Sequence, residues 1–87
     1  MSEFRDLPAP LRALFLAAVV QLVADLRSGH QPRHSLRVKR LQSVPGVWEL
    51  SWAADGRATF QYGRERIPGE THIIWRRIGS HDIFRNT

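Results

Sequence analysis

The longest apolar stretch of this chain, residues 11–26, constrains the fold more than any other feature. Its only polar positions are Arg12, Gln21 and Asp25. Pro10 is tolerated in the first turn of a helix, and Ser28-Gly29 is a stop signal. The sequence therefore predicts one long helix that begins near Ala9 or Pro10. A short helical turn over residues 3–6 is expected to end before Pro8, because a proline disfavours helical geometry in the residue ahead of it.

Nearly every face of this long helix is apolar. One stripe is expected to cover a sheet: Leu11, Leu14, Phe15, Ala18, Leu22 and Leu26. The other stripe has no obvious burial in a chain of 87 residues: Leu16, Val19, Val20 and Val23. Its uncharged run, residues 13–24, is shorter than the ~20 residues that cross a bilayer. We therefore expect burial against a partner protein and not in a membrane; packing under the C-terminal residues of the same chain is the alternative.

Three strand signals follow the turn at Pro45-Gly46. Residues 47–53 and residues 57–63 alternate between apolar and polar side chains, and Asp55-Gly56 between them is typical of a hairpin. Residues 71–78 alternate least and are predicted to lie at the centre of the sheet. The face away from the helix should carry Glu49, Ser51, Arg57, Gln61 and one series of side chains from the last strand.

The segment between the helix and this sheet is polar and basic. Residues 30–34, HQPRH, hold two histidines four positions apart, but Pro32 argues against the helix that would bring them onto one metal ion, so we predict no metal site. Residues 35–42 form either an edge strand or an irregular arm, and their basic side chains, which suit contacts with phosphate, are Arg37, Lys39 and Arg40. The expected fold is α+β: one domain over residues 1–87, with an N-terminal helical hairpin whose long helix packs on three or four antiparallel strands.

Charge is distributed unevenly along the chain. The formal net charge is +5, and residues 33–87 carry all of it, while acids and bases cancel in residues 1–32. Nine of the ten basic residues in the second part are arginines, whose planar guanidinium suits phosphate groups. A polyanionic partner is therefore favoured, and an ordinary solvated basic surface is the alternative. The chain has no cysteine, and its first ten residues hold acids and prolines where a secretory signal needs basic and then apolar residues, so we expect a cytoplasmic protein.

The segments LRVKRLQSVPGVWELSWAADGRATFQY and HIIWRRIGSHDIF resemble the RelE/ParE toxin superfamily of bacterial toxin-antitoxin systems. The shared order is a helix, a basic stretch, a strand opened by glycine and an aromatic residue, a hairpin followed by an arginine, and a last strand ending in Gly-x-His. FRDLPAPLRALF also resembles the helical hairpin of that family around a Leu-Pro pair. The N-terminal strand of the family is missing here.

The resemblance implies an mRNA interferase, which cuts messages on the ribosome by attack of the RNA 2′-hydroxyl on the adjacent phosphate, with no metal or other cofactor. Arg57 matches the arginine that binds the scissile phosphate, although it suits equally a surface ion pair with Asp55 or Glu49. His81 matches the position after Gly-x at the end of the last strand, where RelE-like enzymes have an arginine or a histidine. We assign it as the general acid because a histidine titrates near neutrality; its alternative role is to cap the strand end with Asp82. Glu49 is a candidate general base or a structural partner of Arg57 or Arg77.

Other residues have supporting roles in this interpretation. Phe84 is placed to stack on a base or to plug the core edge, and supporting positive charge would come from Arg76, Arg77 and Arg85, with one of the first two facing the site. The resemblance also implies an antitoxin partner and a homodimer or toxin-antitoxin hetero-oligomer. A ParE-like inhibitor of DNA gyrase that acts by binding, or an inactive RNA-binding relative, are the alternatives. The presence of both Arg57 and His81 favours the nuclease.

Overall fold

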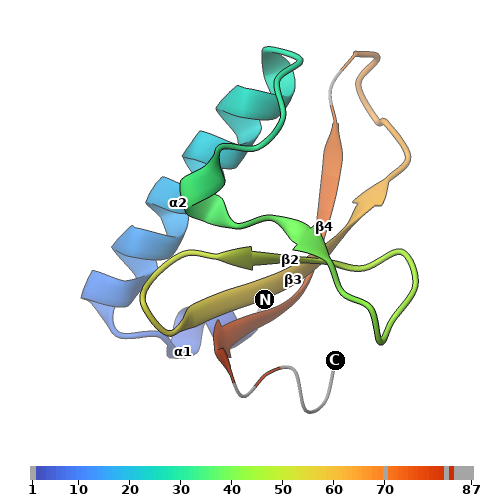
Figure 1. Cartoon of the computed structure of the whole chain (residues 1–87). Coiled ribbons are helices and arrows are strands. Elements are labelled where there is room, and N and C mark those ends of the chain that lie inside the picture. The colour runs from blue at the N-terminus through green and yellow to red at the C-terminus, as the bar shows by residue number, and fades with distance from the viewer. Residues whose placement is uncertain (1, 70, 82, 84–87) are drawn as a thin grey trace.

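The computed structural model describes residues 2–69, 71–81 and 83, and they form an α+β fold (Figure 1). One long helix lies on a four-stranded antiparallel sheet with the strand order β1-β2-β3-β4. The elements are α1 (Ser2–Asp6), α2 (Ala9–Arg27), the 3₁₀ helix η1 (His34–Leu36), β1 (Lys39–Arg40), β2 (Trp48–Ser51), β3 (Gly56–Gly63) and β4 (His72–Ser80). The predicted fourth strand is thus present as a two-residue edge strand.

The sequence signals set the ends of α2 as expected. Pro10 lies in its first turn, and after Arg27 the backbone N–H groups of Ser28 and Gly29 bond to the last carbonyls of the helix, with Gly29 at a φ of 73°. That φ is easy for glycine and strained for other residues. α1 forms the predicted short turn before Pro8, and its Phe4 ring lies 5.8 Å from the ring of Phe15 in α2.

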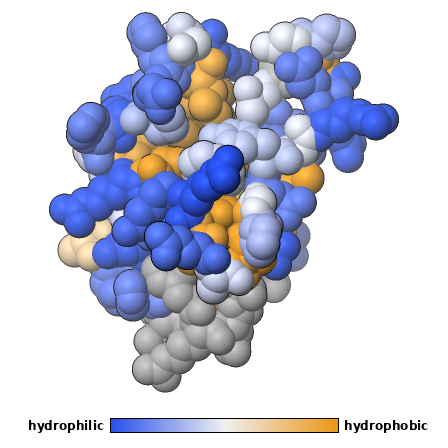
Figure 2. Space-filling model, turned by 45° about the vertical axis from the view of Figure 1, so that its right-hand side comes forward, coloured by the Kyte–Doolittle hydropathy of each residue, from blue (hydrophilic) through white to orange (hydrophobic). Residues whose placement is uncertain are grey.

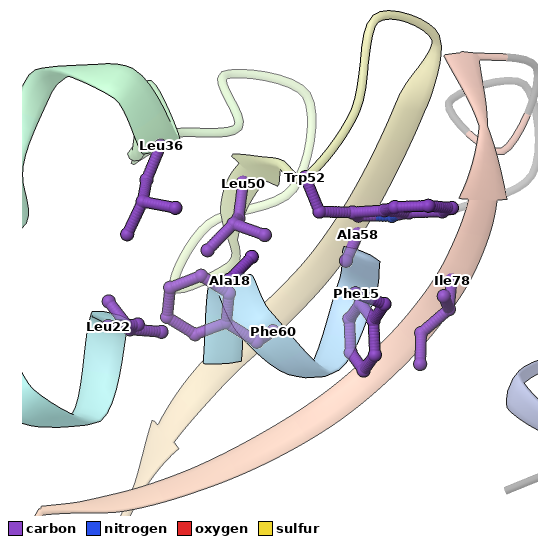
Figure 3. Packing of buried hydrophobic residues seen from close by; sticks show 9 residues of the cluster. All are labelled: Phe15, Ala18, Leu22, Leu36, Leu50, Trp52, Ala58, Phe60 and Ile78. Atoms are coloured by element: carbon purple, nitrogen blue, oxygen red, sulfur yellow. The ribbon is translucent and has the colours of Figure 1, made fainter. Parts of the chain in front are cut away.

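The core lies between α2 and one face of the sheet (Figure 3). Phe15, Ala18 and Leu22 are the buried residues of α2, and burial of a side chain such as Leu22 contributes roughly 1.5–3 kcal/mol. The predicted inner stripe is wrong at its N-terminal end, because Leu11 and Leu14 are 37% and 49% exposed. On the second stripe, Val19 and Val23 are half-buried, whereas Leu16 and Val20 are 49% and 68% exposed.

The hairpin between β2 and β3 is held by packing on an aromatic ring. Trp52 extends across Ala58 and Phe15 (Figure 3), and an added Cβ at Gly56 would meet the Trp52 ring at 2.6 Å. The Asp55-Gly56 signal therefore marks the correct hairpin, but the glycine is required by the close approach of an indole and not by a positive φ.

The predicted position of the last strand is wrong: β3 is central, and β4 is an edge strand. Its poor alternation has another cause, a β-bulge. Thr59 pairs with Arg77 while Phe60 pairs with Trp75, so Arg76 is the additional residue. The edge is protected near its C-terminal end, where the backbone N–H of Ile78 donates to the carboxylate of Glu3 in α1 over 3.1 Å.

Candidate functional site

The sheet face away from α2 carries a row of polar side chains across all four strands. Lys39 pairs with Glu49, Glu49 with Thr59, and Thr59 with Arg77. Residues directly opposite in antiparallel strands project to the same face. The structure therefore confirms the predicted grouping of Glu49, Ser51, Arg57 and Gln61 on this face. Thr59 lies there too, in line with the alternation of residues 57–63, and it is fully buried.

Arg57 lies in β3, and His81 directly follows the neighbouring strand β4 at the same end of the sheet. Arg57 pairs with Ser51 on one side and with Gly79 on the other, and the exposed His81 follows Gly79 by two residues. The side chain of the buried Ile83 packs close to Gly79, because an added Cβ there would lie 2.9 Å from one of its methyl carbons. A larger residue at position 79 would therefore have to displace the Ile83 side chain.

The guanidinium of Arg57 is fixed by its own hairpin. Its Nη1 donates to the carbonyl oxygens of Gly56, Ala53 and Ala54 over 2.9, 3.2 and 3.4 Å. Among the described residues it has no carboxylate partner, so neither expected ion pair, with Asp55 or Glu49, is present. The Arg57 side chain is half-buried and held in place, with Nε and Nη2 left for another ligand.

Glu49 forms an ion pair with Lys39, at 3.6 Å between Nζ and Oε1, and not with Arg57 or Arg77 as the alternative interpretation expected. The carboxylate side chain is only 14% exposed, whereas that of Lys39 is 70% exposed. An ion pair with so exposed a lysine contributes little to stability. Glu49 and Arg57 are diagonal neighbours on β2 and β3, a relationship that places Cα atoms roughly 7–8 Å apart.

The bulge in β4 brings two adjacent arginines to partners on this side of the sheet. The Nη1 of Arg76 donates to Gln61 Oε1 over 3.2 Å, and the Nε of Arg77 donates to Glu3 Oε2 over 2.8 Å. The hydroxyl of Thr59 accepts the backbone N–H of Arg77 over 3.1 Å. The expectation that strand alternation would turn only one of these arginines toward the site is therefore wrong, because the bulge breaks the alternation.

The basic residues before β2 do not form one patch. Lys39 lies on the polar face, whereas Arg40 lies on the opposite face with its guanidinium carbon 5.3 Å from the Trp48 ring centre. Arg37 follows η1 and is exposed. The residues predicted to stack on a base and to supply further charge, Phe84 and Arg85, lie outside the described part of the chain.

The linker after α2 contains an ion pair that the sequence did not reveal. Arg33 donates to both carboxylate oxygens of Asp25, over 3.0 Å from Nε and 2.9 Å from Nη2, and its backbone N–H donates to the same group. The side-chain hydrogen bonds from Arg33 lower the pKa of Asp25 from 3.8 to about 2. Within residues 2–69, 71–81 and 83, no group of three His, Cys, Asp or Glu side chains is arranged to hold a metal ion.

The surface of the protein combines charged side chains with exposed apolar area. On the face shown in Figure 2, hydrophilic side chains surround patches of apolar surface. The helix α2 is long and apolar enough to cross a membrane by length and composition alone, a test that core helices and signal sequences also pass.

The fold and site thus define an α+β protein with a polar, arginine-bearing sheet face opposite its long helix. No protein-family model, curated protein or solved structure matches the chain.

Proposed function

We propose that this chain is a RelE/ParE-like toxin of the RelE type, an endoribonuclease that cleaves mRNA on the ribosome. The observation that carries the proposal is the pairing of Arg57 with Gly79, two residues before His81. The guanidinium of Arg57 and the imidazole of His81, which directly follows β4, thereby come from the same end of the sheet. The order of elements, a helical hairpin followed by an antiparallel meander, supports the same family.

In the proposed reaction, Glu49, His81 and Arg57 each have one role. The RNA 2′-oxygen forms a bond to phosphorus while the bond from phosphorus to the 5′-oxygen breaks, which leaves a 2′,3′-cyclic phosphate and a 5′-hydroxyl. Glu49 takes the 2′-hydroxyl proton, and His81 gives a proton to the departing 5′-oxygen, a contribution of about 10²- to 10⁴-fold for each such group. Arg57 stabilises the charge that develops on the phosphate oxygens.

The fixed guanidinium of Arg57 suits this role. Its Nη1 is already bonded to the hairpin carbonyls, so the remaining donors are oriented before RNA binds. Such preorganisation avoids the cost of ordering a long side chain during the reaction. Arg76 and Arg77 raise the positive charge on this face, although each also bonds a neighbouring side chain.

Partner and location follow from the same proposal. An antitoxin would cover the apolar surface of α2, where Leu14, Leu16 and Val20 are exposed, and the toxin would act in the cytoplasm on translating ribosomes. Contacts with mRNA and the ribosome would involve the polar face and its arginines.

The test is to induce the chain in bacteria and to map new 5′ ends on a translated reporter mRNA by primer extension. We expect ends within the coding region that require translation and disappear in His81→Ala and Arg57→Ala. Matched controls are His72→Ala, at the far end of β4, and Arg64→Ala, in the loop after β3; both should still cut.

Two other outcomes would contradict the proposal. Growth arrest with intact message and inhibited supercoiling by purified gyrase would identify a ParE-like inhibitor. Intact message without arrest would leave an RNA-binding relative without cleavage activity.

A further inference from the structure

A cavity of about 490 Å³ lies between α2, η1 and the β2–β3 hairpin. Its volume falls within the roughly 300–1,000 Å³ typical of small-molecule sites. It differs from the polar sheet face described above because residues of α2, such as Leu14 and Ala17, form one wall. Arg57 and its partner Ser51 border both regions.

Two arginines give this cavity its charge. Arg37 and Arg57 both line it, and none of the residues that line it in the described part of the chain is acidic. The Nη1 of Arg57 is held by hairpin carbonyls, which leaves Nε and Nη2 for a ligand. Two guanidinium groups that have no carboxylate partner among the described residues favour an anion at this cavity, and their planar donors suit phosphate oxygens best.

The backbone at Arg37 shows an unusual conformation at the same place. Its φ of 47° is the only positive value of a non-glycine residue among those described. Residues other than glycine, asparagine and aspartate rarely adopt this left-handed backbone conformation. The residues that do adopt it cluster at ligand sites. The conformation comes directly after η1 and places Arg37 on the cavity opposite α2.

The rest of the lining is suited to a flat, partly apolar group. Leu14, Ala17, Leu36 and Trp52 supply apolar surface, and Gln21 and Ser35 supply hydrogen-bonding side chains. A nucleobase offers a flat face for this apolar surface and hydrogen-bonding groups for Gln21 and Ser35.

We propose that this cavity binds a nucleotide, with the phosphate between Arg37 and Arg57 and the base against α2 and Trp52. The site goes beyond the proposed cleavage chemistry, because it needs no bond to be cut and no ribosome. It gives the protein a means to recognise a single nucleotide by its phosphate and its base together.

The test is a titration of the purified chain with adenosine 5′-monophosphate, followed by calorimetry and by the indole N–H signals of the three tryptophans in NMR spectra. We expect saturable binding that shifts the Trp52 indole signal, which is assigned by its loss in Trp52→Phe. Adenosine and inorganic phosphate should each bind more weakly, since each supplies only half of the contacts.

The decisive variant is Arg37→Asn. Asparagine tolerates the left-handed backbone, so the fold is retained while the guanidinium is removed. We expect affinity for adenosine 5′-monophosphate to fall roughly 10- to 100-fold, as for loss of a charged hydrogen bond. The matched control is Arg66→Gln, which removes the same charge from an exposed loop and should leave the affinity unchanged.

Equal weakening in Arg37→Asn and Arg66→Gln would overturn the proposal, since binding would then follow net charge alone. Equal affinity for adenosine and its monophosphate, or an unmoved Trp52 signal at saturation, would also overturn it. Nucleotide binding without RNA cleavage would uphold this site and reject the nuclease. Cleavage without nucleotide binding would uphold the nuclease and reject this site.

Discussion

Arg77 and Glu3 are 74 residues apart in the sequence, yet the arginine Nε donates to the glutamate Oε2 over 2.8 Å. The second oxygen of the same carboxylate accepts the backbone N–H of Ile78 at the outer edge of β4. One side chain from α1 therefore holds both an arginine of the candidate site and the edge of the sheet.

Replacement of Glu3 is expected to destabilise the fold. Glu3→Ala removes the acceptor of the Ile78 N–H and should lower the free energy of unfolding by about 1–2 kcal/mol. Glu3→Gln keeps an acceptor and loses only the charge, so its cost should be smaller, because this ion pair is partly exposed. Urea unfolding measures both, with Asp6→Asn on the same helix as a near-neutral control. An equal effect of all three variants would contradict the role of Glu3.

The Asp25–Arg33 ion pair is expected to make stability depend on pH in the acid range. The pKa of Asp25 is lowered from 3.8 to about 2 by the hydrogen bonds from Arg33, so the folded state binds this proton less readily than the unfolded chain. The stabilisation is present above pH 4 and is lost as pH falls through about 2. Unfolding curves of the wild type and Asp25→Asn should therefore converge over that window. A difference in unfolding free energy between the two proteins that stays constant with pH would contradict this prediction. Asp55→Asn serves as the charge-matched control.

Tyr62 should ionise later in the folded protein than in the unfolded chain. It packs against the rings of Trp48 and Phe60, and desolvation raises the pKa of its phenol above 10.0. The folded state consequently loses stability as pH rises through that raised pKa, because the unfolded chain ionises first. As Tyr62 is the sole tyrosine, an ultraviolet titration of phenolate reports on it alone. Identical curves in native buffer and in denaturant would show that the phenol is fully hydrated.

Deletion of Arg76 should be tolerated by the fold. Arg76 is the additional residue of the β-bulge, so its removal brings Trp75 next to Arg77 and restores regular alternation with Trp75 still facing the core. Deletion of Ile74 instead shifts Ile73 and His72 to the opposite faces and should unfold the chain. NMR amide spectra and cooperative urea unfolding distinguish the two. An unfolded Arg76 deletion beside a folded Ile74 deletion would contradict the pairing described here.

Gly56→Ala should weaken the hairpin that fixes Arg57. The added methyl group would lie 2.6 Å from the Trp52 ring, and such overpacking costs roughly 1–3 kcal/mol. Ala54→Ser, an exposed change in the same hairpin, should remain within about 0.5 kcal/mol of the wild type. Thermal unfolding of the two variants checks this. A stable Gly56→Ala protein would mean that the indole can move aside.

The sequence predicted the elements that depend on local signals. The apolar run and its flanking proline and glycine set the ends of α2, and alternation in residues 47–63 placed Glu49, Ser51 and Arg57 on one face. The predicted central position of β4 was wrong because a β-bulge and burial on both faces disturb the alternation of apolar and polar residues in the same way. The predicted burial of Leu11 and Leu14 was wrong because the periodicity of a helix does not indicate how far a short sheet extends beneath it.

For the candidate site, the sequence predicted which strand residues share a face but not which contacts they make. Strand periodicity indicated that Arg57 and Glu49 share a face, whereas their actual partners, the hairpin carbonyls and Lys39, follow from the register of pairing. Nothing in the sequence indicated that Glu3 would bond to Arg77 and Ile78, because only the three-dimensional fold brings α1 to the edge of β4. The cavity beside Arg37 was likewise hidden, since it joins residues of a helix, a 3₁₀ turn and a hairpin.

The bond between Glu3 and the edge of β4 also fixes the order of events during synthesis. Residue 3 is made early, but its partners at positions 77 and 78 follow most of the chain. Until β4 has been made, the carboxylate of Glu3 has neither of these two partners, and α1 lacks the strand on which it packs. Completion of the sheet edge, and of the arginine-bearing face beside it, therefore depends on β4, and no N-terminal fragment lacking β4 can reproduce it.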